Sequence, residues 1–166
     1  MSVERQDIYT IGTVARLAGV SVPTIRLYER EGLLIPKRTL SNRRMFDERD
    51  VKRIECIRQM VHDNHLTFAG IRRLFALVPC WELKGCCADD KRLCSAYRST
   101  ELPCWAIENT ICRQKGIDCR TCEVYNAVSS CEFIKDFLKK IGEYDSQEVI
   151  EVIKEQRGKA NRTKKS

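Results

Sequence analysis

Two short helical patterns separated by a glycine lie near the N-terminus, and they constrain the fold more than any other part of the chain. The first pattern places apolar residues at i, i+3, i+4 and i+7, as on one face of a helix: Ile11, Val14, Ala15 and Ala18. Gly19 follows and can take the positive φ that ends a helix in a tight turn. Ser21 can cap a second helix, Pro23 suits its first turn, and Gly32 can end it. This order of elements predicts a helix-turn-helix.

A basic segment follows the second helix. We predict two strands, at residues 33–36 and 44–46, joined by a turn over residues 39–42. The segment between Pro36 and Phe46 has no acidic residue and four basic ones: Lys37, Arg38, Arg43 and Arg44. Because these side chains would attract phosphates, we interpret the hairpin as a wing. The predicted fold class is mainly α: a winged helix-turn-helix, then a small irregular cysteine-rich module and a C-terminal helix.

The second helix and the charge distribution both favour nucleic acid as a partner. Ser21, Thr24 and Arg26 lie near the N-terminal end of that helix, the end that usually meets base edges and phosphates. Residues 1–76 carry 14 Lys and Arg against 9 Asp and Glu, a net charge of +5, whereas residues 77–156 carry 11 against 14, a net charge of −3. The excess positive charge therefore lies on the predicted DNA-binding part and on the C-terminal tail.

Three motifs in this region resemble the DNA-binding domain of the MerR family. The resemblance covers roughly the first 77 residues, and several residue spacings agree at once. The motifs are Ile11-Gly12-x-Val14-Ala15, Thr24-Ile25-Arg26-x-Tyr28-Glu29-x-x-Gly32-Leu33-Leu34-x-Pro36-x-Arg38, and Asn42-Arg43-Arg44-x-Phe46-x-x-x-Asp50-Val51.

The resemblance implies a homodimer that binds a palindromic promoter in double-stranded DNA and often acts by twisting the spacer between promoter elements. RNA polymerase would be a further partner. By position, Arg26 and Tyr28 would contact phosphates from the second helix, and Arg38 and Arg44 from the wing. Leu27 and Arg43 stand where the family commonly has aromatic residues. The predicted DNA-binding residues are Thr13, Ser21, Thr24, Arg26, Tyr28, Arg38, Arg43 and Arg44.

The chain has ten cysteines but neither a secretory signal nor a run of about 20 apolar residues that could span a membrane. We therefore expect a cytoplasmic protein with no membrane partner. Reducing compartments disfavour structural disulfides, so metal, cluster or thiol redox chemistry is the better expectation for the cysteines. Cys56, the single cysteine of the first part, lies in an amphipathic pattern, and we interpret it as a small buried hydrophobic residue.

An internal repeat covers about residues 79–125. Pro79-Cys80-Trp81-x-Leu83 returns as Pro103-Cys104-Trp105-x-Ile107, and each half ends in Cys-x-x-Tyr, at residues 94–97 and 122–125. These paired motifs resemble the two-CW domain, a small cysteine-rich module found fused to bacterial regulators and sensory proteins. We predict that each tryptophan is buried beside a metal-binding loop as a miniature core.

The eight cysteines of the repeat are candidate ligands for Zn²⁺ or an iron–sulfur cluster, because both take four thiolates at short loop spacings. Cys119-x-x-Cys122 has the Cys-x-x-Cys spacing that is common for two cysteine ligands of one metal site. The spacing allows one site in each half, or one shared site that uses Cys80 and Cys104. The candidate ligands are Cys80, Cys86, Cys87, Cys94, Cys104, Cys112, Cys119 and Cys122.

An amphipathic helical segment is predicted at residues 131–156. Its apolar face is our predicted dimer contact, because the dimerisation helix usual in the family is missing from its usual place: Phe133, Ile134, Phe137 and Leu138. The predicted domains are thus residues 1–78 for DNA binding, 79–130 for the cysteine module, 131–156 for this segment and 157–166 for a basic, disordered tail.

Three functional hypotheses follow. The preferred one is a DNA-binding transcriptional regulator that couples a cysteine-bound metal, an iron–sulfur cluster or a thiol redox state to promoter binding. The alternative keeps the regulator but gives the cysteines only a structural Zn²⁺, so that a small molecule or a protein partner carries the signal. The third is a thiol oxidoreductase that uses Cys119 and Cys122. That pair lies outside any β-α-β pattern, so we predict that the protein is not an enzyme.

Overall fold

The computed structural model describes residues 8–132 and residue 135. The described residues up to Cys131 form one compact unit. The predicted dimer contact at Phe133, Ile134, Phe137 and Leu138 lies outside the described residues, as does the basic tail, so both stay predictions. Within the described ranges, no helix is long and apolar enough to cross a bilayer.

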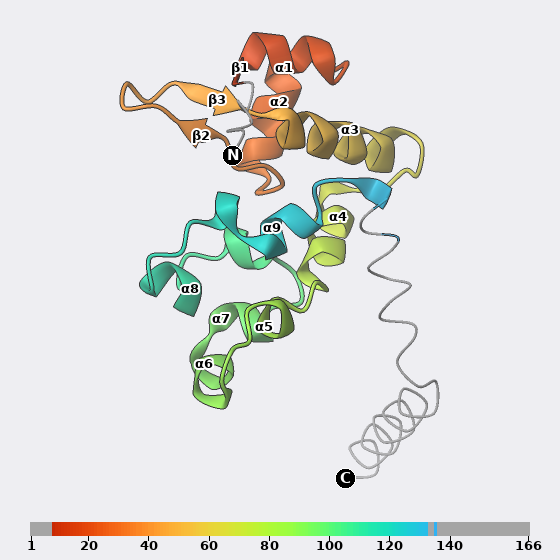
Figure 1. The fold of residues 1–166 in the computed structure, drawn as a ribbon. Coiled ribbons are helices and arrows are strands. Elements are labelled where there is room, and N and C mark those ends of the chain that lie inside the picture. The colour runs from red at the N-terminus through yellow and green to blue at the C-terminus, as the bar shows by residue number, and fades with distance from the viewer. Residues whose placement is uncertain (1–7, 133–134, 136–166) are drawn as a thin grey trace, which may run out of the picture. The chain divides into compact units, whose positions relative to one another are not determined.

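The helix-turn-helix is formed by α1 (Ile11–Leu17) and α2 (Val22–Arg30), which pack against each other (Figure 1). Gly19 lies in the turn between them with φ +64°. Ser21 caps α2 by accepting a hydrogen bond from the backbone N–H of Thr24 at 3.2 Å. These two helices, their turn and the cap of the second helix confirm the prediction.

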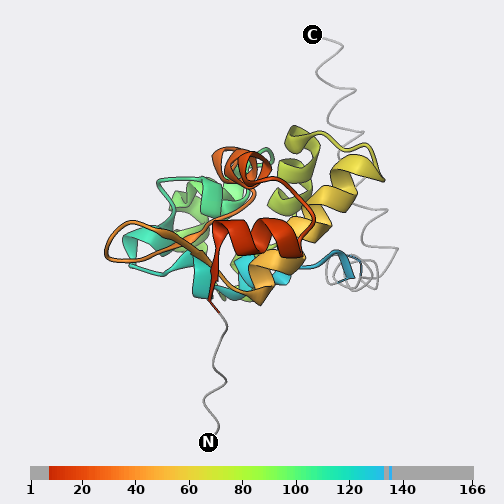
Figure 2. The ribbon, with the colours of Figure 1, turned by 90° about the horizontal axis from the view of Figure 1, so that it is seen from above.

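A three-stranded antiparallel sheet lies beside the helices, with β1 (Tyr9–Thr10), β2 (Lys37–Arg38) and β3 (Arg44–Phe46) in the order β1-β3-β2. Tyr9 pairs with Phe46, and Arg38 pairs with Arg44. The β2–β3 hairpin extends beyond the helices in both views of the fold (Figures 1 and 2). It is the wing that the sequence predicts.

The predicted position of the first wing strand, residues 33–36, is wrong. Leu33 and Leu34 are 0% and 2% exposed because they fill the core below the wing, and Pro36 has no N–H to donate to a strand ladder. The strand therefore begins at Lys37. β1 was not predicted, since two residues are too few to show an alternating pattern.

Two further helices complete the N-terminal part: α3 (Glu48–His62) and α4 (Phe68–Ala76). Asp47 and Asp50 form a capping box at the start of α3, each side chain accepting from the backbone of the other. Thr67 caps α4.

Beneath this part lies a layer of short helical segments (Figure 1): α5 (Cys80–Leu83), α6 (Ala88–Leu93), α7 (Ser95–Arg98), η1 (Cys104–Ala106), α8 (Ile111–Gln114), η2 (Cys119–Thr121) and α9 (Glu123–Ala127). The predicted mainly α class is confirmed.

The sequence repeat is also a structural repeat. In the first half, Trp81 packs edge-on against Tyr97, with ring centroids 5.1 Å apart and planes at 83°. In the second half, Trp105 packs on Tyr125 in the same way, at 5.2 Å and 88°. The tryptophan of each Pro-Cys-Trp motif thus meets the tyrosine of the Cys-x-x-Tyr motif in its own half.

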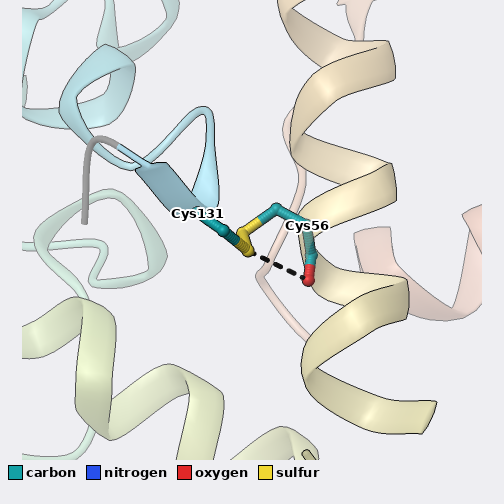
Figure 3. Close-up of a disulfide and its surroundings, with 2 residues drawn as sticks. All are labelled: Cys56 and Cys131. Carbon is teal, nitrogen blue, oxygen red and sulfur yellow. Dashed lines mark hydrogen bonds between the residues drawn. A yellow bond between two sulfur atoms is a disulfide. The ribbon is translucent and has the colours of Figure 1, made fainter. Parts of the chain in front are cut away.

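A disulfide joins Cys56 of α3 to Cys131, 75 residues later (Figure 3). Cys56 is 4% exposed, so its predicted burial is confirmed. Its interpretation as a lone hydrophobic residue is wrong, because the fold places Cys131 beside it with a Cα–Cα distance of 5.3 Å. The expectation of no structural disulfides likewise fails for this pair, which is separate from the eight cysteines of the repeat.

Candidate functional sites

A cavity of about 40 Å³ is lined by residues from both halves of the repeat. Seven of the eight predicted ligands line it: Cys80, Cys86, Cys94, Cys104, Cys112, Cys119 and Cys122. The eighth, Cys87, is exposed, and its sulfur accepts a hydrogen bond from the backbone N–H of Asp90 at 3.5 Å. We call this space the thiol cavity. It contains cysteines from both halves, as the shared-site alternative requires.

The first cysteines of the two halves, Cys80 and Cys104, are hydrogen-bonded to each other. This hydrogen bond lowers the pKa of Cys80 to about 7 and raises the pKa of Cys104. Cys80 therefore ionises first and is partly a thiolate at neutral pH, while Cys104 keeps its proton. Burial raises the pKa of Cys86, Cys112 and Cys119.

Basic side chains surround the thiol cavity. The negative charge of Cys122 raises the pKa of Lys84, which also pairs with Glu123 at 3.4 Å. Burial raises the pKa of Cys119, and the positive charge of Arg113 offsets only part of this rise. Such cations stabilise thiolates, the form of cysteine that binds soft metal ions.

The thiol cavity is not a closed metal site. Among the described residues, no three His, Cys, Asp or Glu side chains converge as a preformed site requires. The donor set nevertheless fits a soft metal, since seven thiols share one space with cations nearby. Binding would draw the thiols together, as is common where metal binding and folding are coupled.

On the predicted DNA-binding surface, Arg26 of α2 and Arg43 of the wing are exposed. Glu29 of α2 holds the other two wing arginines. Its carboxylate accepts from Arg38 at 2.8 Å and from Arg44 at 2.6 Å. The wing is thereby tied to the second helix of the helix-turn-helix.

The predicted hydroxyl residues lie at helix starts. The hydroxyls of Ser21 and Thr24 are 2.7 Å apart at the start of α2, and Thr13 lies 3.1 Å from Thr10 at the start of α1. All four hydroxyls are in exposed positions, so capping and contact with DNA are compatible.

The side chain of Tyr28, for which the resemblance implies a phosphate contact, is buried in the structure. It is 1% exposed and packs edge-on against Phe68, with ring centroids 5.8 Å apart. Burial raises the pKa of its phenol. Tyr28 is part of the core that joins α2 to α4, and its phosphate contact stays a prediction.

Residues 9–77 match the family described as MerR HTH family regulatory protein. They are a MerR-family helix-turn-helix domain. HspR from Streptomyces coelicolor is 34% identical over 74 residues, which are 45% of this chain and 49% of that protein. The transcriptional regulator GlnR from Bacillus anthracis is 36% identical over 70 residues, 42% of this chain and 54% of that protein.

The mercuric resistance operon regulatory protein from Pseudomonas fluorescens is 44% identical over 50 residues, 30% of this chain and 35% of that protein. GlnR and the mercuric resistance protein are both named as regulators. The chain thus covers about half or less of the length of these relatives. No solved structure matches. The family match ends at residue 77, before the first cysteine of the repeat, so the resemblance to the two-CW domain stays a prediction.

The second half of the repeat docks on the MerR-family domain through its aromatic pair. The indole N–H of Trp105 donates to the carbonyl of Gly32 at 2.9 Å, and the phenol oxygen of Tyr125 accepts from the N–H of Ile35 at 2.9 Å. Gly32 has φ +70°, and a Cβ there would lie 3.1 Å from the Cβ of Ala106. Gly32 and Ile35 both lie in the segment that joins α2 to the wing, so both hydrogen bonds hold this segment.

Two arginines add to these contacts between the second half of the repeat and the MerR-family domain, which we call the joint. The guanidinium of Arg53, from α3, lies 3.7 Å from the ring centroid of Tyr125, and it donates to the carbonyl of the same residue. Arg120 pairs with Asp50 at 2.9 Å and with Asp47 at 3.3 Å, and it donates to the carbonyl of Ile35. Arg53 is 1% exposed, and this burial lowers its pKa.

Sequence reasoning missed these joint residues as functional positions. The repeat marks Trp105 and Tyr125, but the expected miniature core is instead shared with the MerR-family domain. Only the second pair is buried, since Trp105 and Tyr125 are 2% and 4% exposed while Tyr97 is 43% exposed. No sequence signal pointed to Arg53 or Arg120, because their partners lie about 70 residues away in the chain.

Proposed function

We propose that this protein is a DNA-binding transcriptional regulator whose thiol cavity couples a metal, an iron–sulfur cluster or a thiol redox state to promoter binding. One observation carries the proposal: Trp105 and Tyr125 belong both to the lining of the thiol cavity and to the joint with the segment between α2 and the wing. A change in the cavity that moves either ring acts directly on the element that positions the wing.

DNA binding is supported by the MerR-family domain and by its exposed basic side chains, Arg26 and Arg43. Glu29 places Arg38 and Arg44 side by side on the wing. We propose that the protein binds a palindromic promoter as a homodimer and that RNA polymerase is a further partner. The N-terminal end of α2 would meet base edges and phosphates, and the wing would contact further phosphates.

Thiolate chemistry is supported by the seven cysteines of the cavity, by the lowered pKa of Cys80 and by the cations nearby. Thiolates select soft ions such as Zn²⁺ and the iron of clusters. A relative is named as the regulator of a mercuric resistance operon, which agrees with a soft-metal signal. A metal or cluster held here would fix the positions of the cysteines on both sides of the aromatic pair.

The test uses a DNA duplex enriched from a random-sequence pool by the protein as purified. We expect its affinity for the reduced, metal-free protein to change several-fold when Zn²⁺ is added, or when the purified cluster-loaded form is used. Tyr125→Phe should reduce this change, whereas the matched control Tyr97→Phe should leave it intact. Equal affinity in metal-free, metal-loaded, cluster-loaded and oxidised protein would overturn the coupling.

The DNA-binding half has its own test. Arg26→Ala should weaken binding and lower the slope of log affinity against log salt by about one unit, because one phosphate contact is lost. Lys52→Ala is the control, since it removes an exposed positive charge from α3 that is paired with Glu48. An unchanged affinity and slope in Arg26→Ala would contradict the placement of α2 on DNA.

A further inference from the structure

We propose that Cys56 and Cys131 are a redox switch, a pair whose disulfide forms on oxidation and opens on reduction while the protein stays folded. Neither cysteine lines the thiol cavity, so the pair is a second thiol site, separate from the one in the proposed function. The proposal rests on that function in one respect, since a DNA-binding regulator works in the cytosol or the nucleus, where thiols are kept reduced. Disulfides in such compartments are usually transient and sense redox state.

Cys56 lies on a face of α3 that contacts the end of the cysteine repeat and the residues just after it. Arg49, Arg53 and Cys56 are spaced i, i+4 and i+7, so their side chains lie on one side of the helix. Arg49 donates to the side-chain oxygen of Asn126 at 3.4 Å. Arg53 donates to the carbonyl of Tyr125. The third contact of this face, the disulfide of Cys56, is covalent, and oxidation or reduction can therefore make or break it.

The disulfide acts on the joint because Cys131 follows Tyr125 by only six residues. The phenol oxygen of Tyr125 accepts a hydrogen bond from the N–H of Ile35, in the segment that leads to the wing. With the disulfide closed, Cys131 cannot leave α3, and the short stretch before it keeps Tyr125 in place. With the disulfide open, non-covalent contacts alone hold this stretch. The joint is therefore expected to open more often in the reduced protein.

The surroundings of the pair suit the reduced form as well as the oxidised one. The sulfur of Cys131 lies 3.6 Å from the backbone carbonyl oxygen of Cys56 (Figure 3). When the disulfide opens, the thiol of Cys131 can donate to this oxygen, so the reduced side chain has a partner without moving. Reduction therefore leaves a contact with α3 in place, as a reversible switch requires.

The two cysteines differ in their access to solvent. Cys131 is half-buried, whereas Cys56 is 4% exposed. A reagent from solution can therefore reach the sulfur of Cys131, while Cys56 reacts with Cys131. One reachable sulfur with a buried partner beside it is sufficient for thiol–disulfide exchange.

The oxidant belongs to the class of low-molecular-weight disulfides. The thiolate of Cys131 attacks one sulfur of the oxidant, which forms a mixed disulfide and releases one small thiolate. The thiolate of Cys56 then attacks the sulfur of Cys131, which closes the protein disulfide and releases the second small thiolate. The two protons of the protein thiols end on the released thiolates, and two electrons pass from the protein to the oxidant. Reduction by the small thiol is the same sequence in reverse.

The experiment equilibrates the folded, full-length protein with glutathione or with glutathione disulfide. Peptide mass spectrometry after acid quenching reads whether Cys56 and Cys131 are bonded, and hydrogen exchange at the amide of Ile35 is measured on the same samples. We expect the pair to be mostly reduced in glutathione and mostly bonded in glutathione disulfide, with exchange several-fold slower in the bonded form. A disulfide that glutathione does not open in the folded protein, a pair that never bonds, or equal exchange in both forms would overturn the proposal.

Two variants separate this switch from the other thiols. Cys131→Ser keeps a hydroxyl that can donate to the carbonyl of Cys56, so it stands for the reduced state, and exchange at Ile35 should be fast with either reagent. Cys87→Ser is the matched control and should behave as wild type, because it removes an exposed cysteine of the repeat. If glutathione disulfide still slows exchange in Cys131→Ser, another thiol pair causes the effect and the proposal is wrong.

The outcome is separable from that of the proposed function. A reversible disulfide that slows exchange at Ile35, together with a DNA affinity that no state of the thiol cavity changes, would keep the switch and overturn the coupling. A several-fold change in DNA affinity on addition of Zn²⁺, with no reversible bond between Cys56 and Cys131, would keep the coupling and overturn the switch.

Discussion

The two halves of the cysteine repeat have the same local structure but different surroundings. Each has an arginine two residues before its Cys-x-x-Tyr motif, and each packs its tryptophan edge-on against its tyrosine. In the second half these residues dock on the MerR-family domain: Trp105, Arg120 and Tyr125. Their counterparts in the first half have no such partner among the described residues: Trp81, Arg92 and Tyr97. The repeat thus contains the same tryptophan, arginine and tyrosine arrangement twice, and only the second copy contacts the MerR-family domain.

The largest expected difference between the halves concerns the tryptophans. Trp105→Ala should lower the free energy of unfolding by about 3–5 kcal/mol, because it removes a 2% exposed ring and its hydrogen bond to Gly32. Trp81→Ala should cost clearly less, since the ring of Trp81 is only half-buried. Urea unfolding followed by circular dichroism measures both. Equal losses would show that the two halves contribute alike to stability.

The arginines come next. Arg120→Ala should cost about 2–4 kcal/mol, because it leaves the carboxylate of Asp50, whose side chain is 3% exposed, without its cation. Arg92→Ala should cost less than about 1 kcal/mol, since Arg92 and its partner Asp89 have side chains 75% and 77% exposed. The same unfolding measurement applies. A loss for Arg92→Ala that matches Arg120→Ala would contradict the asymmetry.

The tyrosines should differ by a single hydrogen bond. Tyr125→Phe removes the acceptor for the N–H of Ile35, which is expected to cost about 1 kcal/mol. Tyr97→Phe removes the hydroxyl of an exposed ring and should be close to neutral. Hydrogen exchange at the amide of Ile35 gives a local readout, and exchange should speed up in Tyr125→Phe alone. Unchanged protection in that variant would mean that the hydrogen bond does not hold the segment.

The smallest expected effect separates the paired cysteines by reactivity. Because the pKa of Cys80 is lowered to about 7, its thiolate fraction rises as pH increases through 7 and is lost as pH falls below it. Cys104, whose pKa is raised, stays a thiol over the same range. Alkylation of metal-free protein at pH 7.5, read by peptide mass spectrometry, should therefore label Cys80 several-fold faster. Equal rates, or faster labelling of Cys104, would contradict the assignment of the lower pKa to Cys80.

The sequence by itself determined the helix-turn-helix, the helix caps and the repeat, because the interactions that form them act between residues close together in the chain. The apolar stripe from Ile11 to Ala18, the Gly19 turn and the Ser21 cap act within a few residues of each other, so the helix-turn-helix could be predicted with its boundaries. The caps at Asp47 and Thr67 are equally local. Repetition of the Pro-Cys-Trp and Cys-x-x-Tyr motifs likewise marked the cysteines that line the cavity, because duplicated sequence folds into duplicated local structure.

Only the tertiary structure decided how these parts meet. The sequence could not place Cys87 outside the cavity, bury Tyr28, or bring Cys131 to Cys56, because each outcome depends on residues distant in the chain. The docking of the second half depends on the carbonyl of Gly32 and the N–H of Ile35, backbone groups that every sequence offers and no motif announces. Which of two equivalent Trp–Tyr pairs is buried is settled by packing against the MerR-family domain, and so is the path from thiol cavity to wing.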